Sequence, residues 1–451
     1  MMAAIRQAQF GNTALDSRIS LPKIAIMNSL GDFSFNSYCW HVSEALGKQG
    51  WSVDLYTNAE PGVLESMPRV QAHKRHLLWG SFIRGERQPN EDEGCGEPVI
   101  SGGNLDAELA RRVGNWENLL RRYLRPPLLT HQTLWTLRQN GIRILWTQWP
   151  EPEPYLANLW DWARRYGMLT VHTVHNVLPH EVRPGDRERY QRAYASADLL
   201  LVHSEESRKR LLTEFPIVDP AKTVMHRMGL YQVYPRNTGK RRSLRQSWGL
   251  NEDQCVFLVC GLIRPYKNVD VVIEAFQKCS DPRAILLIAG REMGFPESDP
   301  AEPLKQTRKK IRDLGLSERV KLWPGYLSAE EMSGLLEASD VLMLPYKEGY
   351  GSGLLLLGMT FGKQVVTTMV GGAQEYLEEY QGKVLLPNAS VGALVDAWPE
   401  VLRRWENRDR EKSSESAVWY EAPESLQWDE AVKPLIEGLK RAWVAKSCEN
   451  G

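Results

Sequence analysis

The second half of the chain alternates short apolar runs with amphipathic stretches at helical spacing. The apolar runs predict strands at 255–260, 284–289, 320–323, 341–344 and 364–368. The amphipathic stretches predict helices at 269–277, 303–314, 329–338 and 352–361. Strands that alternate with helices in this way form a parallel, doubly wound α/β sheet.

The first half shows the same alternation less regularly. An apolar run at 24–27, a turn that contains Gly31, a helical stretch and a second apolar run at 51–56 form a βαβ unit. Further strands are predicted at 142–146, 169–174 and 199–202, with a helix at 154–166. The expected fold class is therefore α/β, with two doubly wound domains.

The pattern divides the chain into four segments. We expect a loose leader at 1–20, a first domain at 21–233, a second domain at 234–400 and a C-terminal helical segment at 401–451. The stretch 234–250 has the composition of a linker, and the polar stretch 80–104 is rich in Gly, Pro and Glu, which predicts a loop. Apolar residues recur at helical spacing between 426 and 445, so this tail must bury one face against a domain.

Composition excludes several classes of protein. Lys and Arg number 56 and Asp and Glu number 56, so the formal charge is zero and a dedicated nucleic-acid binder is disfavoured. No apolar run reaches the roughly 18 residues that span a bilayer, and the first residues lack a signal peptide's apolar core. The six cysteines show no CxxC spacing, so we expect reduced thiols in a cytoplasmic protein.

The segment GLIRPYKN places two cations just after a buried strand. The strand ends at Gly261, and Arg264 and Lys267 follow before the next helix. Ligands of doubly wound sheets bind outside the carboxyl ends of the strands, so both side chains are expected in the ligand crevice. Arg as a fork and Lys as a point charge suit a diphosphate, although two solvated basic residues on a loop would show the same pattern.

A glycine-rich turn follows the strand at 341–344 and opens a helix. It contains Gly349, Gly351 and Gly353. Free backbone amides at a helix N-terminus form an anion site, and glycines let a phosphate approach the backbone. Glu348 precedes the turn and can accept hydrogen bonds from sugar hydroxyls.

The segment VHTVHNVLPHE places polar groups at the end of a first-domain strand. They are His175, Asn176, His180 and Glu181, whereas His172 lies within the strand and is predicted to be packed. Ser204 is a predicted helix cap. The chain has neither a DxD motif nor a clustered set of metal ligands, so we expect no metal and no other cofactor.

These motifs, in this order, resemble the retaining GT-B glycosyltransferases of family 4, also called group 1. The resemblance covers nearly the whole second domain and is more diffuse in the first. It implies two Rossmann-like domains that face a cleft, with a C-terminal helix that crosses back to the first domain. It also implies transfer of a sugar from a nucleoside diphosphate to an acceptor hydroxyl with retention of anomeric configuration.

The resemblance assigns roles to individual residues. It implies that Arg264 and Lys267 hold the donor pyrophosphate, and that His175 and Glu348 contact the transferred sugar. The other donor-binding positions that it implies are Gly31, Gly261, Gly290, Tyr326, Ser352, Gly353 and Leu354. The family usually has a second glutamate that contacts the ribose; Leu357 stands at that position here. The chain is therefore similar to a subgroup that lacks this acid.

The expected partners are a nucleotide-sugar donor and an acceptor saccharide or glycolipid, as in surface polysaccharide or glycoconjugate synthesis. Residues 111–143 carry seven arginines against one acid, Glu117, with interleaved aromatic residues. Such a stretch suits contact with anionic headgroups at the inner face of a membrane. A packed helix with arginines that reach solvent is the alternative.

Three rival functions stay open at this point. A nucleotide-sugar epimerase or a phosphorylase has the same kind of fold, and the missing second glutamate also fits a non-catalytic nucleotide-sugar binding protein. An epimerase needs no acceptor. A phosphorylase needs a cofactor lysine, for which the sequence offers no candidate.

Overall fold

The computed structural model describes most of the chain in ten ranges. These are 21–28, 33–57, 70–74, 125–148, 155–179, 182–236, 241–291, 302–349, 352–411 and 419–449. The predicted leader at 1–20, Gly31, the loop at 80–104, and the pair His180 and Glu181 lie outside them.

The first domain is built on a parallel sheet with the strand order β3-β2-β1-β4-β5-β6-β7. Its strands are β1 (Lys23–Asn28), β2 (Val53–Thr57), β3 (Val70–Lys74), β4 (Ile142–Thr147), β5 (Leu169–Thr173), β6 (Leu199–Val202) and β7 (Thr223–Met225). Its helices are α1 (Phe33–Lys48), α4 (Arg125–Gln139), α5 (Tyr155–Arg165), α6 (Asp186–Ser196) and α7 (Glu205–Glu214). Every residue of β5 and β6 is buried, as in a sheet covered on both faces.

The second domain repeats this plan with the order β10-β9-β8-β11-β12-β13. Its strands are β8 (Cys255–Cys260), β9 (Ala284–Gly290), β10 (Val320–Pro324), β11 (Val341–Leu344), β12 (Gln364–Thr368) and β13 (Lys383–Leu386). Its helices are α8 (Arg241–Ser247), α9 (Val269–Gln277), α10 (Glu302–Asp313), α11 (Ala329–Ala338), α12 (Gly353–Thr360), α13 (Ala373–Leu377) and α14 (Val391–Glu411).

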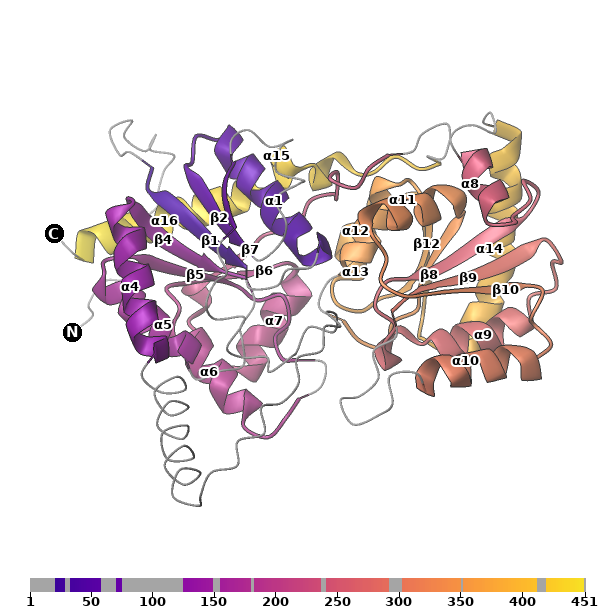
Figure 1. Ribbon diagram of the computed structural model, residues 1–451, viewed down its shortest axis with the longest axis horizontal. Helices are drawn as coiled ribbons and strands as arrows, with labels where there is room; N and C mark the ends of the chain where they lie inside the picture. Colours follow the sequence, from indigo (N-terminus) through magenta and orange to yellow (C-terminus); the bar gives the residue numbers. More distant parts are fainter. Residues whose placement is uncertain are drawn as a thin grey trace, which may run out of the picture.

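Strand order reverses between β1 and β4 in one sheet and between β8 and β11 in the other. Crevices outside the carboxyl ends of strands at such points are where doubly wound folds bind ligands. The two domains lie side by side in Figure 1. The predicted α/β class with two Rossmann-like domains is therefore confirmed.

The C-terminal segment returns to the first domain. It consists of the short turn η5 (Glu424–Leu426), α15 (Trp428–Ala431) and α16 (Lys433–Glu449), and α16 packs on β5, β6 and β7 (Figure 1). The Trp428 Nε1 donates to the Leu230 carbonyl at 2.8 Å, and Lys446 pairs with Asp198 at 3.3 Å. The crossing-back helix is thus present. The boundary drawn at 400 falls inside α14, which packs on α9 and β13 of the second domain.

The predicted linker at 234–250 contains a docked helix, α8, rather than an extended connection. Arg241 and Arg245 of this helix are buried and both contact the buried Asp340 carboxylate, Arg245 at 3.6 Å. The basic composition that indicated a solvated linker therefore has another cause. These arginines face a carboxylate that is distant in sequence, and burial of the charges requires this pairing.

Two smaller predictions are confirmed. His172 is fully buried, and its Nδ1 lies 2.9 Å from the Thr147 Oγ1. Ser204 caps α7, because its side chain accepts from the Ser207 amide. No helix in the described ranges combines the length and the apolarity needed to cross a bilayer.

Candidate functional site

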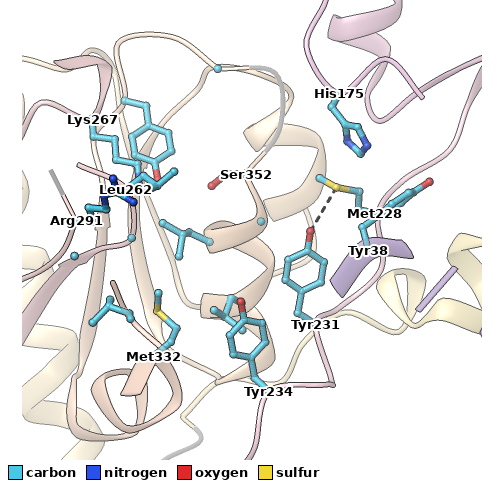
Figure 2. A pocket seen from close by; sticks show the side chains of 18 of the residues that line it. Tyr38, His175, Met228, Tyr231, Tyr234, Leu262, Lys267, Arg291, Met332 and Ser352 are labelled. Atoms are coloured by element: carbon cyan, nitrogen blue, oxygen red, sulfur yellow. Dashed lines mark hydrogen bonds between the residues drawn. The ribbon is translucent and has the colours of Figure 1, made fainter. Parts of the chain in front are cut away.

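A cavity of about 280 Å³ lies between the carboxyl ends of the two sheets and is lined by residues of both domains. The first domain contributes Tyr38, His175, Asn176 and His203, and the connection after β7 adds Met228, Tyr231 and Tyr234. Figure 2 shows His175 and Tyr38 on one side of this space and Lys267 and Arg291 on the other. The cavity therefore brings together motifs from both halves of the chain.

Lys267 supplies a positive charge to the second-domain wall. It is the last residue of a short 3₁₀ turn, η4 (Pro265–Lys267), and its ammonium donates to the Cys260 carbonyl at 3.2 Å. Burial, with repulsion from Arg264, lowers its pKa to about 8. No carboxylate in the described ranges forms an ion pair with Lys267, so the cavity presents this charge to an anionic ligand.

Asn268 fixes the turn that carries Lys267. Its backbone is left-handed, with φ 60°. Its buried amide nitrogen donates to the carbonyls of Pro345 and Ala389, at 3.1 Å each. The turn after β8 is therefore tied to the end of β11, which places Lys267 at the point where strand order reverses.

Glycines allow the ends of β8 and β9 to meet beneath the cavity. Gly290 has φ 144°, and a Cβ on it would lie 1.9 Å from the Gly261 carbonyl oxygen. The amide of Gly261 in turn donates to the Ala289 carbonyl at 3.0 Å. Any side chain at 290 would separate the strand ends, so the two predicted glycines belong to the floor of the site.

The N-terminus of α12 opens into the same cavity. Ser352 caps the helix by accepting from the Leu355 amide at 3.2 Å, and Ser352, Gly353 and Leu354 all line the space. A Cβ at Gly353 would approach the Tyr231 ring to 2.9 Å. Backbone amides at such a terminus favour a phosphate. Leu357, one turn further, also lines the cavity, so the wall there is apolar.

His175 faces the cavity from the first domain, just after β5. Its Nε2 lies 3.1 Å from the Gln148 Oε1, and its Nδ1 lies 3.2 Å from the His203 Nε2. The Tyr38 ring meets it edge-on, with the ring centroids 5.4 Å apart. Burial and the neighbouring His203 lower the pKa of His175 well below its usual value. The imidazole is therefore neutral at physiological pH and suited to hydrogen bonding.

The structure separates the predicted site residues into two groups. Eight of them line the cavity: His175, Gly261, Lys267, Gly290, Tyr326, Ser352, Gly353 and Leu354. Arg264 is half-buried and Glu348 is exposed, and neither is among the lining residues. Both charges act on the pKa of Tyr266, which burial raises, so they lie near the rim of the site. Gly31 lies outside the described ranges.

Arg291, which the sequence analysis does not name, is an exposed cation that lines the cavity directly after β9. Its position could have been predicted, because a basic residue just after a strand is the same pattern that indicated Arg264 and Lys267. Nor does the sequence pattern indicate Tyr231, Tyr234 or Met228. These lie in a connection without regular structure, whose course no periodicity predicts.

Comparisons with known proteins agree with this geometry. The sequence model described as Glycosyltransferase Family 4 matches residues 36–227, and that of Glycosyl transferases group 1 matches residues 240–417. D-inositol 3-phosphate glycosyltransferase from Mycobacterium leprae is 23% identical over 422 residues, which cover 90% of this chain and 88% of that protein. The enzyme of the same name from Mycolicibacterium smegmatis is 24% identical, with 90% and 86% covered.

Solved structures show the same fold. The Anabaena protein HepE in complex with UDP and glucose has a TM-score of 0.59 at 16% identity, with 95% of this chain and 100% of that chain covered. A glycosyltransferase from Rickettsia africae has a TM-score of 0.64 at 13% identity, with 94% and 99% covered. Sucrose-phosphate synthase from Thermosynechococcus elongatus has a TM-score of 0.61 at 16% identity, with 94% and 100% covered.

Proposed function

Since this chain belongs to the GT-B glycosyltransferases of family 4, or group 1, we propose that it moves a sugar from a nucleoside diphosphate to an acceptor hydroxyl with retention of anomeric configuration. One observation carries the proposal. Lys267 and the N-terminus of α12 lie on one wall of a cavity whose other wall carries His175. The first wall suits a diphosphate, and the second suits the sugar attached to it.

The leaving group determines the chemistry on the second-domain side. As the bond to the sugar breaks, negative charge develops on the diphosphate, and fixed donors stabilise that charge most when they are already in place. Lys267 and the amides at 353–354 are held by the contacts described above, with Arg264 and Arg291 beside them. In this proposal the chain's own cations and amides neutralise the diphosphate, and no metal is required.

The first-domain side orients the transferred sugar. His175 is neutral and hydrogen-bonded, so in this proposal it contacts a sugar hydroxyl without adding a charge beside the sugar. Glu348, at the rim, orients the sugar from the opposite domain. The acceptor enters from the first domain. UDP-glucose is the first donor to test, because the Anabaena relative is described with UDP and glucose.

The proposed acceptor is a saccharide or a glycolipid of the inner membrane face, in surface polysaccharide or glycoconjugate synthesis. Helix α4, within the predicted basic stretch 111–143, buries Leu134 and Leu137 and exposes 55% of Trp135. An exposed Trp on a helix in a basic stretch suits peripheral membrane contact. Residues 111–124 lie outside the described ranges. Liposome co-sedimentation at low salt tests this contact; no binding to anionic vesicles would reject it.

A donor panel with and without acceptor tests the proposed function. Nucleoside diphosphate release that requires both the donor and an acceptor supports transfer. Conversion of the nucleotide sugar without any acceptor would indicate an epimerase, and binding without turnover would indicate a non-catalytic protein. The anomeric configuration of the product, read by proton NMR, then tests retention.

A further inference from the structure

A row of hydrogen-bonded side chains runs from the cavity toward the C-terminal segment. Gln148 Oε1 lies 3.1 Å from the His175 Nε2, and His175 Nδ1 lies 3.2 Å from the His203 Nε2. His203 Nδ1 lies 3.0 Å from the backbone carbonyl oxygen of His226. Each imidazole therefore uses both ring nitrogens inside this row, so the proton positions on the two rings depend on each other.

The carbonyl of His226 fixes the direction of the hydrogen bonds. A carbonyl oxygen only accepts, so His203 must carry its proton on Nδ1. Burial lowers the pKa of His203 to about 4, so its ring is neutral and its Nε2 is an acceptor. His175 must then donate from its own Nδ1, because its neighbour in the row can only accept. This leaves the His175 Nε2 with a lone pair.

The side chain of Gln148 fits this direction of the hydrogen bonds once its amide oxygen and nitrogen exchange places. Its Oε1 would face the lone pair of the His175 Nε2, acceptor against acceptor, while its Nε2 is buried without a hydrogen-bond partner in the described ranges. Exchange of the amide oxygen and nitrogen resolves both conflicts, because the nitrogen then donates to His175. The exchanged amide is therefore consistent with the direction that the His226 carbonyl sets.

We propose that His203 is a positioning residue that holds His175 as the neutral Nδ1–H tautomer, so that His175 presents Nε2 as a hydrogen-bond acceptor. In the free protein Gln148 donates to that nitrogen. A substrate hydroxyl donates to it when the donor is bound. The inference rests on the proposed function only for the nature of that hydroxyl, which belongs to the transferred sugar.

His203 is itself held from both domains. The Tyr376 hydroxyl of α13 donates to the His203 carbonyl at 2.7 Å, and the Met228 amide donates to the Tyr376 oxygen at 3.0 Å. His226 donates from Nδ1 to the Ala431 carbonyl of α15 at 2.9 Å, which fixes the strand end that carries the accepting carbonyl. The tautomer of His175 therefore depends on the first domain, the second domain and the returning C-terminal segment together.

Nitrogen-15 NMR of the full chain labelled in histidine tests the proposal. Long-range proton–nitrogen correlations distinguish a protonated Nδ1 from a protonated Nε2, and His175→Gln identifies the signals of His175 by their loss. We expect Nδ1–H on both His175 and His203 in the wild type. A His175 ring protonated on Nε2 would overturn the proposal, without reference to any activity or to the folding of a variant.

A variant pair adds a second readout. In His203→Asn the side-chain nitrogen can still donate to the His226 carbonyl, but no atom remains to accept from His175. We expect the His175 signals to shift toward Nε2–H and the donor KM to rise about tenfold. His131→Asn, at a partly buried histidine on α4 that contacts Tyr166 outside the cavity, should change neither. An unchanged His175 tautomer in a folded His203→Asn would also overturn the proposal.

The two readouts separate the proposals. If the tautomers are as expected but no donor is turned over with any acceptor, the proposed function fails and the role of His203 in positioning His175 stands. If sugar transfer is observed with His175 protonated on Nε2, the transferase assignment stands and the positioning role fails.

Discussion

Glu206 and Glu375 cap each other's helices across the interface between the two domains. The Glu206 carboxylate accepts from the amides of Gly371 and Gly372 before α13, at 3.3 and 2.6 Å. The Glu375 carboxylate accepts from the amides of Glu205 and Glu206 at the start of α7, at 3.0 and 3.1 Å. A Cβ on Gly372 would lie 2.4 Å from that of Ser204, so the two helix ends are in direct contact. The reciprocal caps therefore join the first domain to the second at these two helix ends.

Removal of either carboxylate should open the cleft. A cap of this kind contributes roughly 0.5–2 kcal/mol, so Glu206→Ala or Glu375→Ala should raise the donor KM about fivefold. Small-angle X-ray scattering should show a larger radius of gyration. Glu205→Ala is the matched control, since its exposed carboxylate pairs only with Arg208 on the same helix, at 3.0 Å, among the described residues. An equal effect in this control would reject the role of the two caps.

The charge of Lys267 should make donor use depend on pH. The pKa of Lys267 is lowered to about 8, and the ammonium is charged below that value and neutral above it. We therefore expect kcat/KM for the donor to fall as pH rises through about 8, because the free enzyme's pKa governs this parameter. In Lys267→Arg the guanidinium stays charged, so the rate should be lower overall but without this fall. The same alkaline fall in both enzymes would contradict the assignment.

Because of Leu357, the site should discriminate only weakly between a ribose and a 2′-deoxyribose in the ligand. The cavity wall is apolar at the position where the family usually has a ribose-binding glutamate. Because Leu357 carries no carboxylate, a ligand that lacks the 2′-hydroxyl of its ribose would leave no buried charge without a hydrogen-bond partner. We expect UDP and its 2′-deoxy counterpart to inhibit with constants that differ by less than about tenfold, or about 1.4 kcal/mol. A difference of a hundredfold or more would show another strong ribose contact.

Gly290 should tolerate no side chain. Gly290→Ala would place a methyl group against the Gly261 carbonyl and strain a backbone at φ 144°, and these two effects should together cost roughly 2–6 kcal/mol. Gly315→Ala is the matched control, because its φ is 68° and nothing lies within 4 Å of the added carbon. Thermal unfolding should show a large loss of Tm for Gly290→Ala and a small one for Gly315→Ala. Similar losses would contradict the close contact of β8 and β9.

The fold was largely predictable because the local signals agree. Helix α11 has the predicted limits 329–338, and its N-terminus carries a capping box formed by Ser328 and Glu331. Helix α8 was not predictable in the same way. Its apolar content is low, and it is held by the pairing of Arg241 and Arg245 with Asp340, about a hundred residues away in sequence. A contact of that kind leaves no periodic pattern.

The candidate site was predictable where ligand-binding residues follow a strand or open a helix. Lys267, Gly290, Ser352 and His175 have such positions, and the order of the strands brings them together. The placement of Arg264 and Glu348 at the rim depends on side-chain direction, which the sequence pattern does not specify. The sequence pattern does not single out His203, because its contact with His175 depends on how two strand ends meet.

The proposed function requires that the cavity between the two domains binds a nucleoside diphosphate through Lys267. Calorimetric titration with UDP, GDP and dTDP tests it most directly, with wild type, Lys267→Met and the exposed Lys278→Met compared at low salt. We predict that at least one diphosphate binds the wild type, that Lys267→Met raises its Kd by about tenfold or more, and that Lys278→Met leaves it unchanged. Equal affinities in all three proteins, or no binding to a folded wild type, would show that Lys267 does not bind a diphosphate in this cavity.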